Sequence, residues 1–166
     1  MKYFSLALLT FVVYSCNTSQ QQDNKGVSSG AQKDSLRTLL MNVDRSWSER
    51  SRQKGYHASR LDFASDSAID LLDGEMPLHG IKEIKQYAAT HPDSSYTLEW
   101  KPLRCAVATS GDIGYTYGGW TMHTKTKQQS DTSLYGDYIT VWKKQTDGSW
   151  KYVVDGGTNT PKRVEY

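Results

Sequence analysis

The second half of this chain is a run of long strand-like segments with no helical segment between them. Apolar and polar side chains alternate over four segments, at residues 96–108, 113–125, 132–144 and 150–155. Turn signals such as Asp147-Gly148 separate these segments. The chain before residue 93 has helical spacing instead, with apolar residues at Leu36, Leu39, Leu40, Val43 and Trp47. Helices followed by a meander of strands predict an α+β fold and argue against a doubly wound parallel sheet.

Three helices are expected before the strands, with one short strand among them. A polar cap precedes Leu36, and Gly55 ends the first helix. A short second helix covers residues 56–63, and the third begins near Gly80 and ends at the His-Pro pair that follows. The short strand is expected at residues 67–72, where an Asp-Gly turn closes it.

Two features predict that the sheet is irregular and strongly curved. Pro102 has no N–H to donate, so its strand should carry a bulge there or lie at an edge of the sheet. The next strand contains three glycines, Gly114, Gly118 and Gly119. Glycines inside a strand are typical of sharp bends and close backbone approach.

The N-terminus has the pattern of a processing signal. Lys2 precedes a mostly apolar run at residues 3–14, which is shorter than the roughly 20 residues of a membrane-spanning helix and suits a secretory signal. The run ends in Val-Tyr-Ser-Cys, and this sequence resembles a bacterial lipobox, in which the cysteine is acylated and becomes the first residue. We therefore predict a lipoprotein signal peptide at residues 1–15 and lipidation, with palmitate, at Cys16. The alternative is a plain secretory signal, with the protein released.

A polar segment follows the predicted lipidation site. Residues 17–34 are rich in Gln, Ser, Asn and Gly, so they cannot bury an apolar face. We predict a disordered, lipidated tether at residues 16–34 and a folded domain at residues 35–166. The protein would be anchored to the bacterial cell envelope. Because Asn17 is not an aspartate, the resemblance to sorted lipoproteins implies the outer membrane.

Four segments together resemble one family. They are residues 56–66 (YHASRLDFASD), 77–81 (PLHGI), 110–118 (SGDIGYTYG) and 138–151 (YITVWKKQTDGSWK). They are similar to the domain-of-unknown-function 4440 group of the SnoaL-like, nuclear-transport-factor-2-like (ketosteroid-isomerase-like) superfamily. The resemblance implies a cone, in which a strongly curved antiparallel sheet wraps round three N-terminal helices. It also implies one of two functions, proton-transfer catalysis or non-catalytic binding of a ligand or partner.

The candidate site residues follow from this expected cone. Asp155 ends an otherwise apolar strand and Asp66 precedes the short strand, although a turn or capping role is the simpler account of each. The catalytic candidates are Asp155, Asp66 and Tyr117, with the carboxylates as bases and the tyrosine as a donor. The expected ligand pocket contains Tyr56, His57, Tyr115, Trp120 and Tyr138.

Several classes of protein are excluded or disfavoured. The four histidines have no metal-ligand spacing, so we expect no metal and no cofactor. A formal net charge of +2 is too small for a nucleic-acid binder, and two cysteines exclude a disulfide scaffold. We therefore predict an envelope lipoprotein whose cone binds a small hydrophobic molecule or a partner. The alternative is a ketosteroid-isomerase-like acid–base enzyme acting on a small hydrophobic substrate.

The segment at residues 138–142 predicts a homodimer. Tyr138 and Trp142 fall on one face of their strand, and Ile139 and Val141 fall on the other. A sheet with one wet face would alternate apolar with polar residues, so both faces should be covered. The helices cover one face, and a second subunit or the chain's own tail, residues 159–166, must cover the other. Sheet-to-sheet pairing is also what the family resemblance implies. The alternative is a monomer with scattered aromatic residues on its surface.

Overall fold

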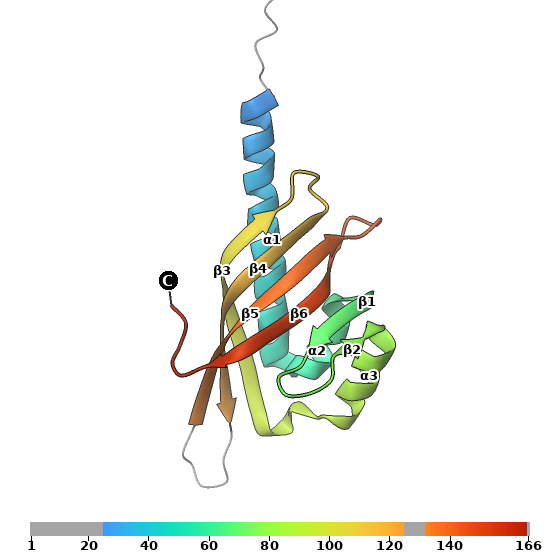
Figure 1. Cartoon of the computed structure of the whole chain (residues 1–166), viewed down its shortest axis with the longest axis vertical. Helices are drawn as coiled ribbons and strands as arrows, with labels where there is room; N and C mark the ends of the chain where they lie inside the picture. The colour runs from blue at the N-terminus through green and yellow to red at the C-terminus, as the bar shows by residue number, and fades with distance from the viewer. Residues whose placement is uncertain (1–24, 125–131, 166) are drawn as a thin grey trace, which may run out of the picture.

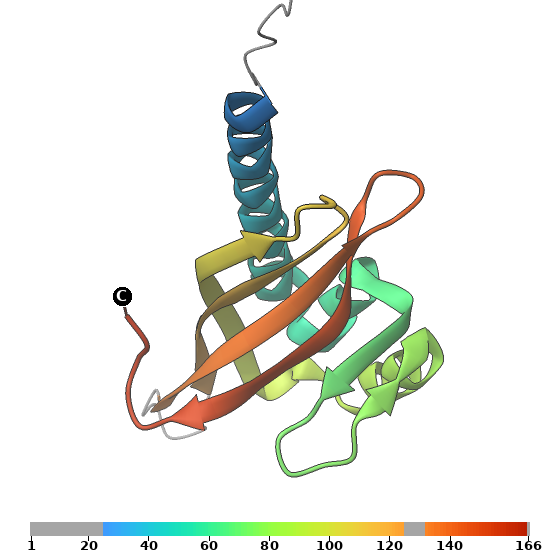
Figure 2. The ribbon, with the colours of Figure 1, turned by 45° about the horizontal axis from the view of Figure 1, so that its top comes forward.

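The computed structural model describes residues 25–124 and 132–165 and confirms the α+β fold (Figure 1). The helices are α1 (Lys25–Lys54), α2 (Tyr56–Phe63) and α3 (Gly80–Thr90), with a 3-10 turn at Asp93–Ser95. The strands are β1 (Ala64–Leu71), β2 (Leu78–His79), β3 (Tyr96–Val107), β4 (Ile113–Thr124), β5 (Thr132–Lys144) and β6 (Trp150–Thr160). They form one curved sheet in the order β2-β1-β6-β5-β4-β3. Figure 2 shows this sheet crossing in front of α1, with α3 beside β1 and β2 at one edge.

The sheet was expected to be antiparallel, but it is mixed, because β1 and β6 pair in parallel. The other neighbouring strands are antiparallel. The parallel pair joins segments far apart in the chain, since β1 comes between the helices and β6 is the last strand. An alternating pattern indicates that a strand exists but not the direction of its neighbour, so the sequence could not reveal this pairing.

Helix α1 begins earlier than expected. It starts at Lys25, so residues 25–34 of the predicted tether are helical, and their described side chains, from Ala31 to Asp34, are exposed to solvent. Once a packed segment such as that around Leu40 and Trp47 has nucleated a helix, each further turn needs no new nucleus. The predicted signal peptide, Cys16 and the rest of the tether lie outside the described residues. No helix in the described part of the chain is both long and apolar enough to cross a membrane.

Helix α1 packs along the edge strand β3 and satisfies its backbone. The Ser51 hydroxyl donates to the carbonyl oxygen of Leu98 at 2.7 Å. The Ser48 hydroxyl donates to the carbonyl oxygen of Trp100 at 2.8 Å and accepts from the Trp100 N–H at 2.8 Å. An edge strand covered in this way cannot pair with another chain through these groups.

The predicted irregularity at Pro102 is confirmed. The β3–β4 register shifts between Pro102 and Arg104, which leaves Leu103 as an extra residue. Gly118 is paired with Pro102, and a Cβ atom at Gly118 would lie 2.1 Å from the carbonyl oxygen of Lys101. Glycine is therefore required for the two strands to approach this closely.

The outer face of the sheet is only partly covered. Tyr138 and Trp142 are buried on the inner face, whereas Ile139 is 46% exposed on the outer face, as their alternation predicts. Ile113 and Tyr115 are each 41% exposed. At one end of this face the C-terminal tail covers the sheet, because Val164 lies over Gly119.

Candidate functional site

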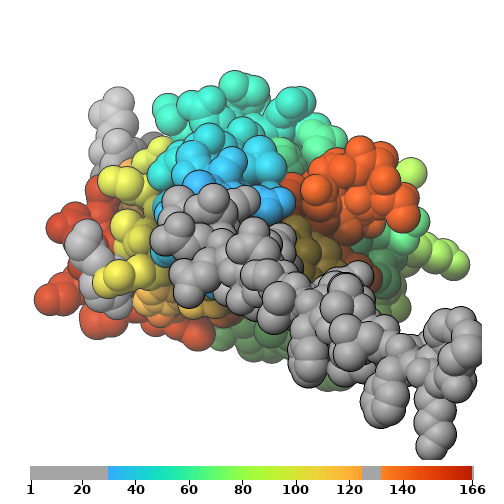
Figure 3. Space-filling model, turned by 90° about the horizontal axis from the view of Figure 1, so that it is seen from above, coloured from blue at the N-terminus to red at the C-terminus, as the bar shows by residue number. Residues whose placement is uncertain are grey.

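A cavity of about 270 Å³ lies between the helices and the inner face of the sheet. Many of its lining residues come from the start of β3 and from the last residues of β4 and β6. These segments lie at the end of the molecule away from the start of α1 (Figure 1). Figure 3 views the molecule from that opposite end, where α1 (blue) and the turn between β5 and β6 (orange) are visible. The cavity wall is largely aromatic and apolar, and includes Trp47, Tyr56, Leu98, Trp100, Trp120 and Tyr138.

A β-bulge turns Asp155 toward this cavity. In β6, Tyr152 pairs with Trp142 but Val154 pairs with Val141, so Val153 is an extra residue. Without the bulge, Tyr152 and Val154 would share the inner face and Asp155 would point outward. With the bulge, both Tyr152 and Asp155 face inward, and they are 0% and 9% exposed.

The Asp155 carboxyl accepts two hydrogen bonds inside the cone. The Thr140 hydroxyl donates to Oδ1 at 2.6 Å, and the Tyr56 hydroxyl donates to Oδ2 at 3.1 Å. Burial raises the pKa of Asp155, and the neighbouring Asp70 carboxylate raises it further, to about 7. Asp155 can therefore gain or lose a proton near neutral pH.

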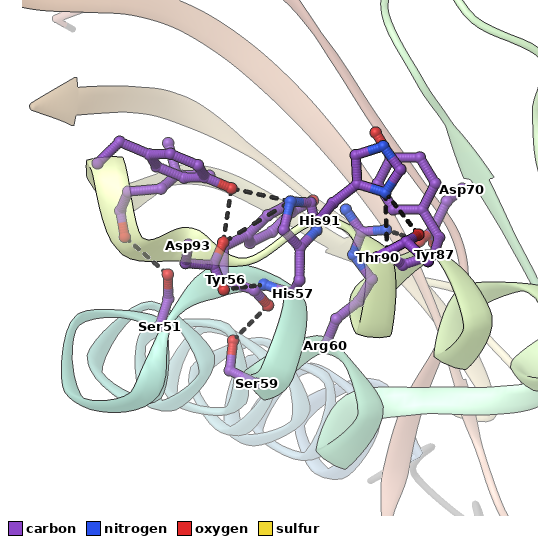
Figure 4. Close-up of polar contacts among 12 residues, drawn as sticks. Ser51, Tyr56, His57, Ser59, Arg60, Asp70, Tyr87, Thr90, His91 and Asp93 are labelled. Atoms are coloured by element: carbon purple, nitrogen blue, oxygen red, sulfur yellow. Dashed lines mark hydrogen bonds and ion pairs between the residues drawn. The ribbon is translucent and has the colours of Figure 1, made fainter. Parts of the chain in front are cut away.

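Asp70 lies beside Asp155 and forms a buried ion pair. The two aspartates are partners in the parallel β1–β6 register. Arg60 Nη1 lies 2.7 Å from Asp70 Oδ2, and the two side chains are 1% and 2% exposed. The Arg60 guanidinium also stacks over the Tyr56 ring, 4.5 Å from its centroid. Figure 4 shows Arg60 projecting from α2 toward Asp70.

A third buried carboxyl, Asp44 on α1, fixes two aromatic residues of the wall. The Trp100 indole N–H donates to Asp44 Oδ1 at 2.6 Å, and the Tyr138 hydroxyl donates to Oδ2 at 2.8 Å. Asp44 is fully buried, and this burial raises its pKa. We infer that Asp44 orients Trp100 and Tyr138 and does not contact a ligand, because it is absent from the cavity lining.

A hydrogen-bonded group of three residues includes two that line the cavity, His57 and Tyr96. Asp93 Oδ2 accepts the backbone N–H of His57 at 2.9 Å, near the start of α2, and Asp93 Oδ1 accepts the Tyr96 hydroxyl at 2.6 Å (Figure 4). Because the Tyr96 proton points at Asp93, the 2.9 Å contact between Tyr96 and His57 assigns the imidazole proton to Nε2. Burial lowers the pKa of His57 to about 4, so this histidine is neutral at pH 7.

Five of the residues expected at the site line this cavity. They are Tyr56, His57, Trp120, Tyr138 and Asp155. Three others lie elsewhere in the fold: Asp66 is exposed on β1, Tyr115 is on the outer face, and Tyr117 donates its hydroxyl to Asp137 Oδ2 at 3.2 Å. The two tyrosines point away because Thr116, between them, faces inward and is fully buried.

Sequence reasoning missed Arg60, Asp70 and Asp44. A weak signal existed for Asp44, which follows Leu40 by four residues and precedes Trp47 by three, on the apolar face of α1. Arg60 follows Tyr56 by four residues and so shares its helix face. In the described part of the chain, no group of three or more His, Cys, Asp or Glu side chains is placed to hold a metal ion.

Comparison with solved structures identifies the fold. A nuclear-transport-factor-2-like protein with a cystatin-like fold from Novosphingobium aromaticivorans superposes with a TM-score of 0.68 at 10% identity, covering 85% of this chain and 92% of that one. The chain has the nuclear-transport-factor-2-like fold. A ketosteroid isomerase-like protein from Erwinia carotovora atroseptica gives a TM-score of 0.60 at 12% identity, over 75% of this chain and 96% of that one.

A third solved structure that matches has a different described role. The association domain of CaMKII from C. elegans gives a TM-score of 0.57 at 11% identity, over 79% of this chain and 98% of that domain. No family model matches the sequence, and no curated protein matches it either. The narrower domain-of-unknown-function 4440 group therefore stays a prediction. Fold likeness at these identities does not decide chemistry.

Proposed function

We propose that the protein binds a small, largely apolar molecule in the cone's cavity, with a polar group of that molecule on Asp155. The observation that carries this proposal is a buried carboxyl facing an aromatic cavity. Burying such a group is costly unless it is hydrogen-bonded, and its oxygens can accept more bonds than the two they receive. Apolar walls with a few convergent polar groups are typical of small-molecule sites.

Binding is tested most simply through the tryptophans of the cavity wall. Trp100 and Trp120 should change their fluorescence when an apolar fragment enters, and native mass spectrometry should detect the complex. Met122→Trp should fill part of the cavity and weaken binding at least tenfold. Met76→Trp is the matched control, because Met76 is 82% exposed and outside the lining. Equal binding by both variants would contradict the cavity as the site.

A second candidate function is acid–base catalysis, favoured by the pKa of Asp155 near 7. Two tyrosine hydroxyls that could serve as proton donors, those of Tyr56 and Tyr138, already donate to buried carboxyls. We place binding first for this reason. A small unsaturated ketone, whose isomerisation changes its absorbance, tests catalysis. Asp155→Asn should then lower turnover by about 10²–10⁴-fold while the ketone still binds. If the unaltered protein does not turn the ketone over, binding without catalysis remains as the proposed function.

We also propose that the protein is an envelope lipoprotein, acylated at Cys16 and held at the outer membrane. The lipobox-like sequence and the short apolar run before it support this. Labelled palmitate should enter the unaltered protein but not Cys16→Ser, which should be released or left unprocessed. Label in the Cys16→Ser protein would contradict the proposal, and release of the unaltered protein would indicate simple secretion.

Finally, we propose a homodimer formed through the outer face of the sheet. Ile113, Tyr115 and Ile139 give this face an exposed apolar surface that the C-terminal tail leaves open. Ile139→Glu should shift sedimentation toward the monomer. Leu39→Glu is the matched control, because Leu39 is also 46% exposed but lies on α1. A single monomeric species of the unaltered protein at tens of micromolar would contradict the proposal.

A further inference from the structure

The groups around Asp155 leave its charge without a cation of its own. The titratable side chains that face it are Asp70 from β1, Arg60 and Tyr56 from α2, Tyr138 from β5 and Tyr152 from β6. Among these, Asp70 and Arg60 carry charge, and they are paired with each other at 2.7 Å. Among the described residues no cation lies within ion-pair distance of Asp155, and burial and the neighbouring Asp70 carboxylate raise the pKa of Asp155.

Two further titratable residues that line the cavity, Asp73 and His57, add no compensating positive charge. Asp73 lies on the rim and accepts a hydrogen bond from Asn159 at 2.5 Å. His57, also on the rim, is neutral at pH 7 because burial lowers its pKa to about 4. Three carboxyls therefore line the cavity, those of Asp70, Asp73 and Asp155, against the guanidinium of Arg60.

The walls of the cavity are also suited to a positive charge. Aromatic faces attract cations within about 6 Å of the ring centroid, and tryptophan does so most strongly. The fold already uses this interaction beside the cavity, in the stack of Arg60 on Tyr56. Trp100 and Trp120 line the same cavity, and Asp44 fixes the first of them through its indole N–H.

We propose that the cavity selects a small organic cation, a protonated amine with an apolar body, whose ammonium group lies on Asp155. The apolar body would lie against Trp100 and Trp120. This inference rests on the proposed binding function and names the class of ligand. A cavity of about 270 Å³ suits a single ring with a short side chain. An ammonium group supplies the countercharge that Asp155 lacks, whereas a carboxylate ligand would add a like charge.

Three probes that share a phenyl ring and a short chain test this choice. They are 2-phenylethylamine, 2-phenylethanol and 3-phenylpropanoate, measured by calorimetry on the purified protein at about pH 8. The amine should bind at least tenfold more tightly than the alcohol, and the anion should bind most weakly. From pH 8 to pH 6 the affinity for the amine should fall, because Asp155 takes up a proton while the amine stays charged. The affinity for the alcohol should change little.

The variant Asp155→Asn should remove the preference for the amine over the alcohol. The probe and pH comparisons on the unaltered protein stand whether or not this variant folds. Equal affinity for amine and alcohol, or tightest binding of the anion, would overturn the inference while leaving a binding cavity intact. If none of the three probes binds, the inference is overturned. The proposed function itself is rejected only if the tryptophan fluorescence and mass spectrometry screen also finds no bound fragment.

Discussion

Replacing Arg60 by methionine should destabilise the fold by leaving the Asp70 carboxyl buried without its cation. Methionine keeps much of the apolar stem, so the change acts mainly on charge. The guanidinium lies 2.7 Å from Asp70 Oδ2, and both side chains are almost fully buried. In the register, Asp155 is the direct neighbour of Asp70, so two carboxyls would then be buried side by side.

The expected cost follows from this burial. Removing one partner of a buried ion pair typically costs about 3–5 kcal/mol, because the remaining charge is uncompensated. For a domain of this size, that corresponds to a fall in melting temperature of about 10 °C or more. Adding Asp70→Asn to Arg60→Met removes the stranded charge and should restore about half of the loss or more.

The dependence on pH separates this explanation from a simple loss of packing. Burial already raises the pKa of Asp70, and without Arg60 this pKa should rise further, so the folded protein binds a proton that the unfolded chain releases. The penalty should therefore be largest at about pH 8 and smaller at about pH 5. Urea unfolding followed by tryptophan fluorescence measures both values. A cost below about 1 kcal/mol, or the same cost at both pH values, would refute the reasoning.

Two further predictions concern Asp155 and the glycines of the sheet. Because the pKa of Asp155 is raised to about 7 in the folded state, its contribution to stability falls as pH rises from about 4 to about 7, by about 4 kcal/mol at most. The stability of Asp155→Asn relative to the unaltered protein should thus improve over that range in urea titrations, and a constant difference would contradict the assignment. Gly118→Ala should cost about 2 kcal/mol or more, since its Cβ would lie 2.1 Å from the Lys101 carbonyl oxygen. Gly30→Ala, in an open part of α1, should be neutral or slightly stabilising; equal melting temperatures for the two variants would contradict this account.

Local patterns predicted much of the fold. The helix at residues 56–63 and the strand at residues 132–144 have the bounds that their spacing and flanking turn residues indicate. The register shift at Pro102 could also be predicted, because a missing N–H is a property of one residue. Strand β2 was missed, since two residues are too few for any periodicity.

The site depended on features that no local pattern records. Asp155 faces the cavity because Val153 is an extra residue in β6, and that bulge is set by pairing with β5. Asp70 lies beside Asp155 because β1 pairs in parallel with β6, which the sequence did not reveal, and Arg60 reaches Asp70 from α2. Asp66 was a candidate because it precedes the expected short strand, but it is exposed on its strand.

Carbon-13 NMR titration of the Asp155 side-chain carboxyl tests its role in the cavity most directly. The aspartates are labelled, and the signal that disappears in Asp155→Asn is assigned to this residue. A buried carboxyl beside Asp70 should titrate with a midpoint near pH 7 in the free protein, and bound 2-phenylethylamine should move this midpoint to lower pH. A midpoint near the ordinary aspartate value of about 4 would contradict the placement of Asp155 as the desolvated polar group of the cavity.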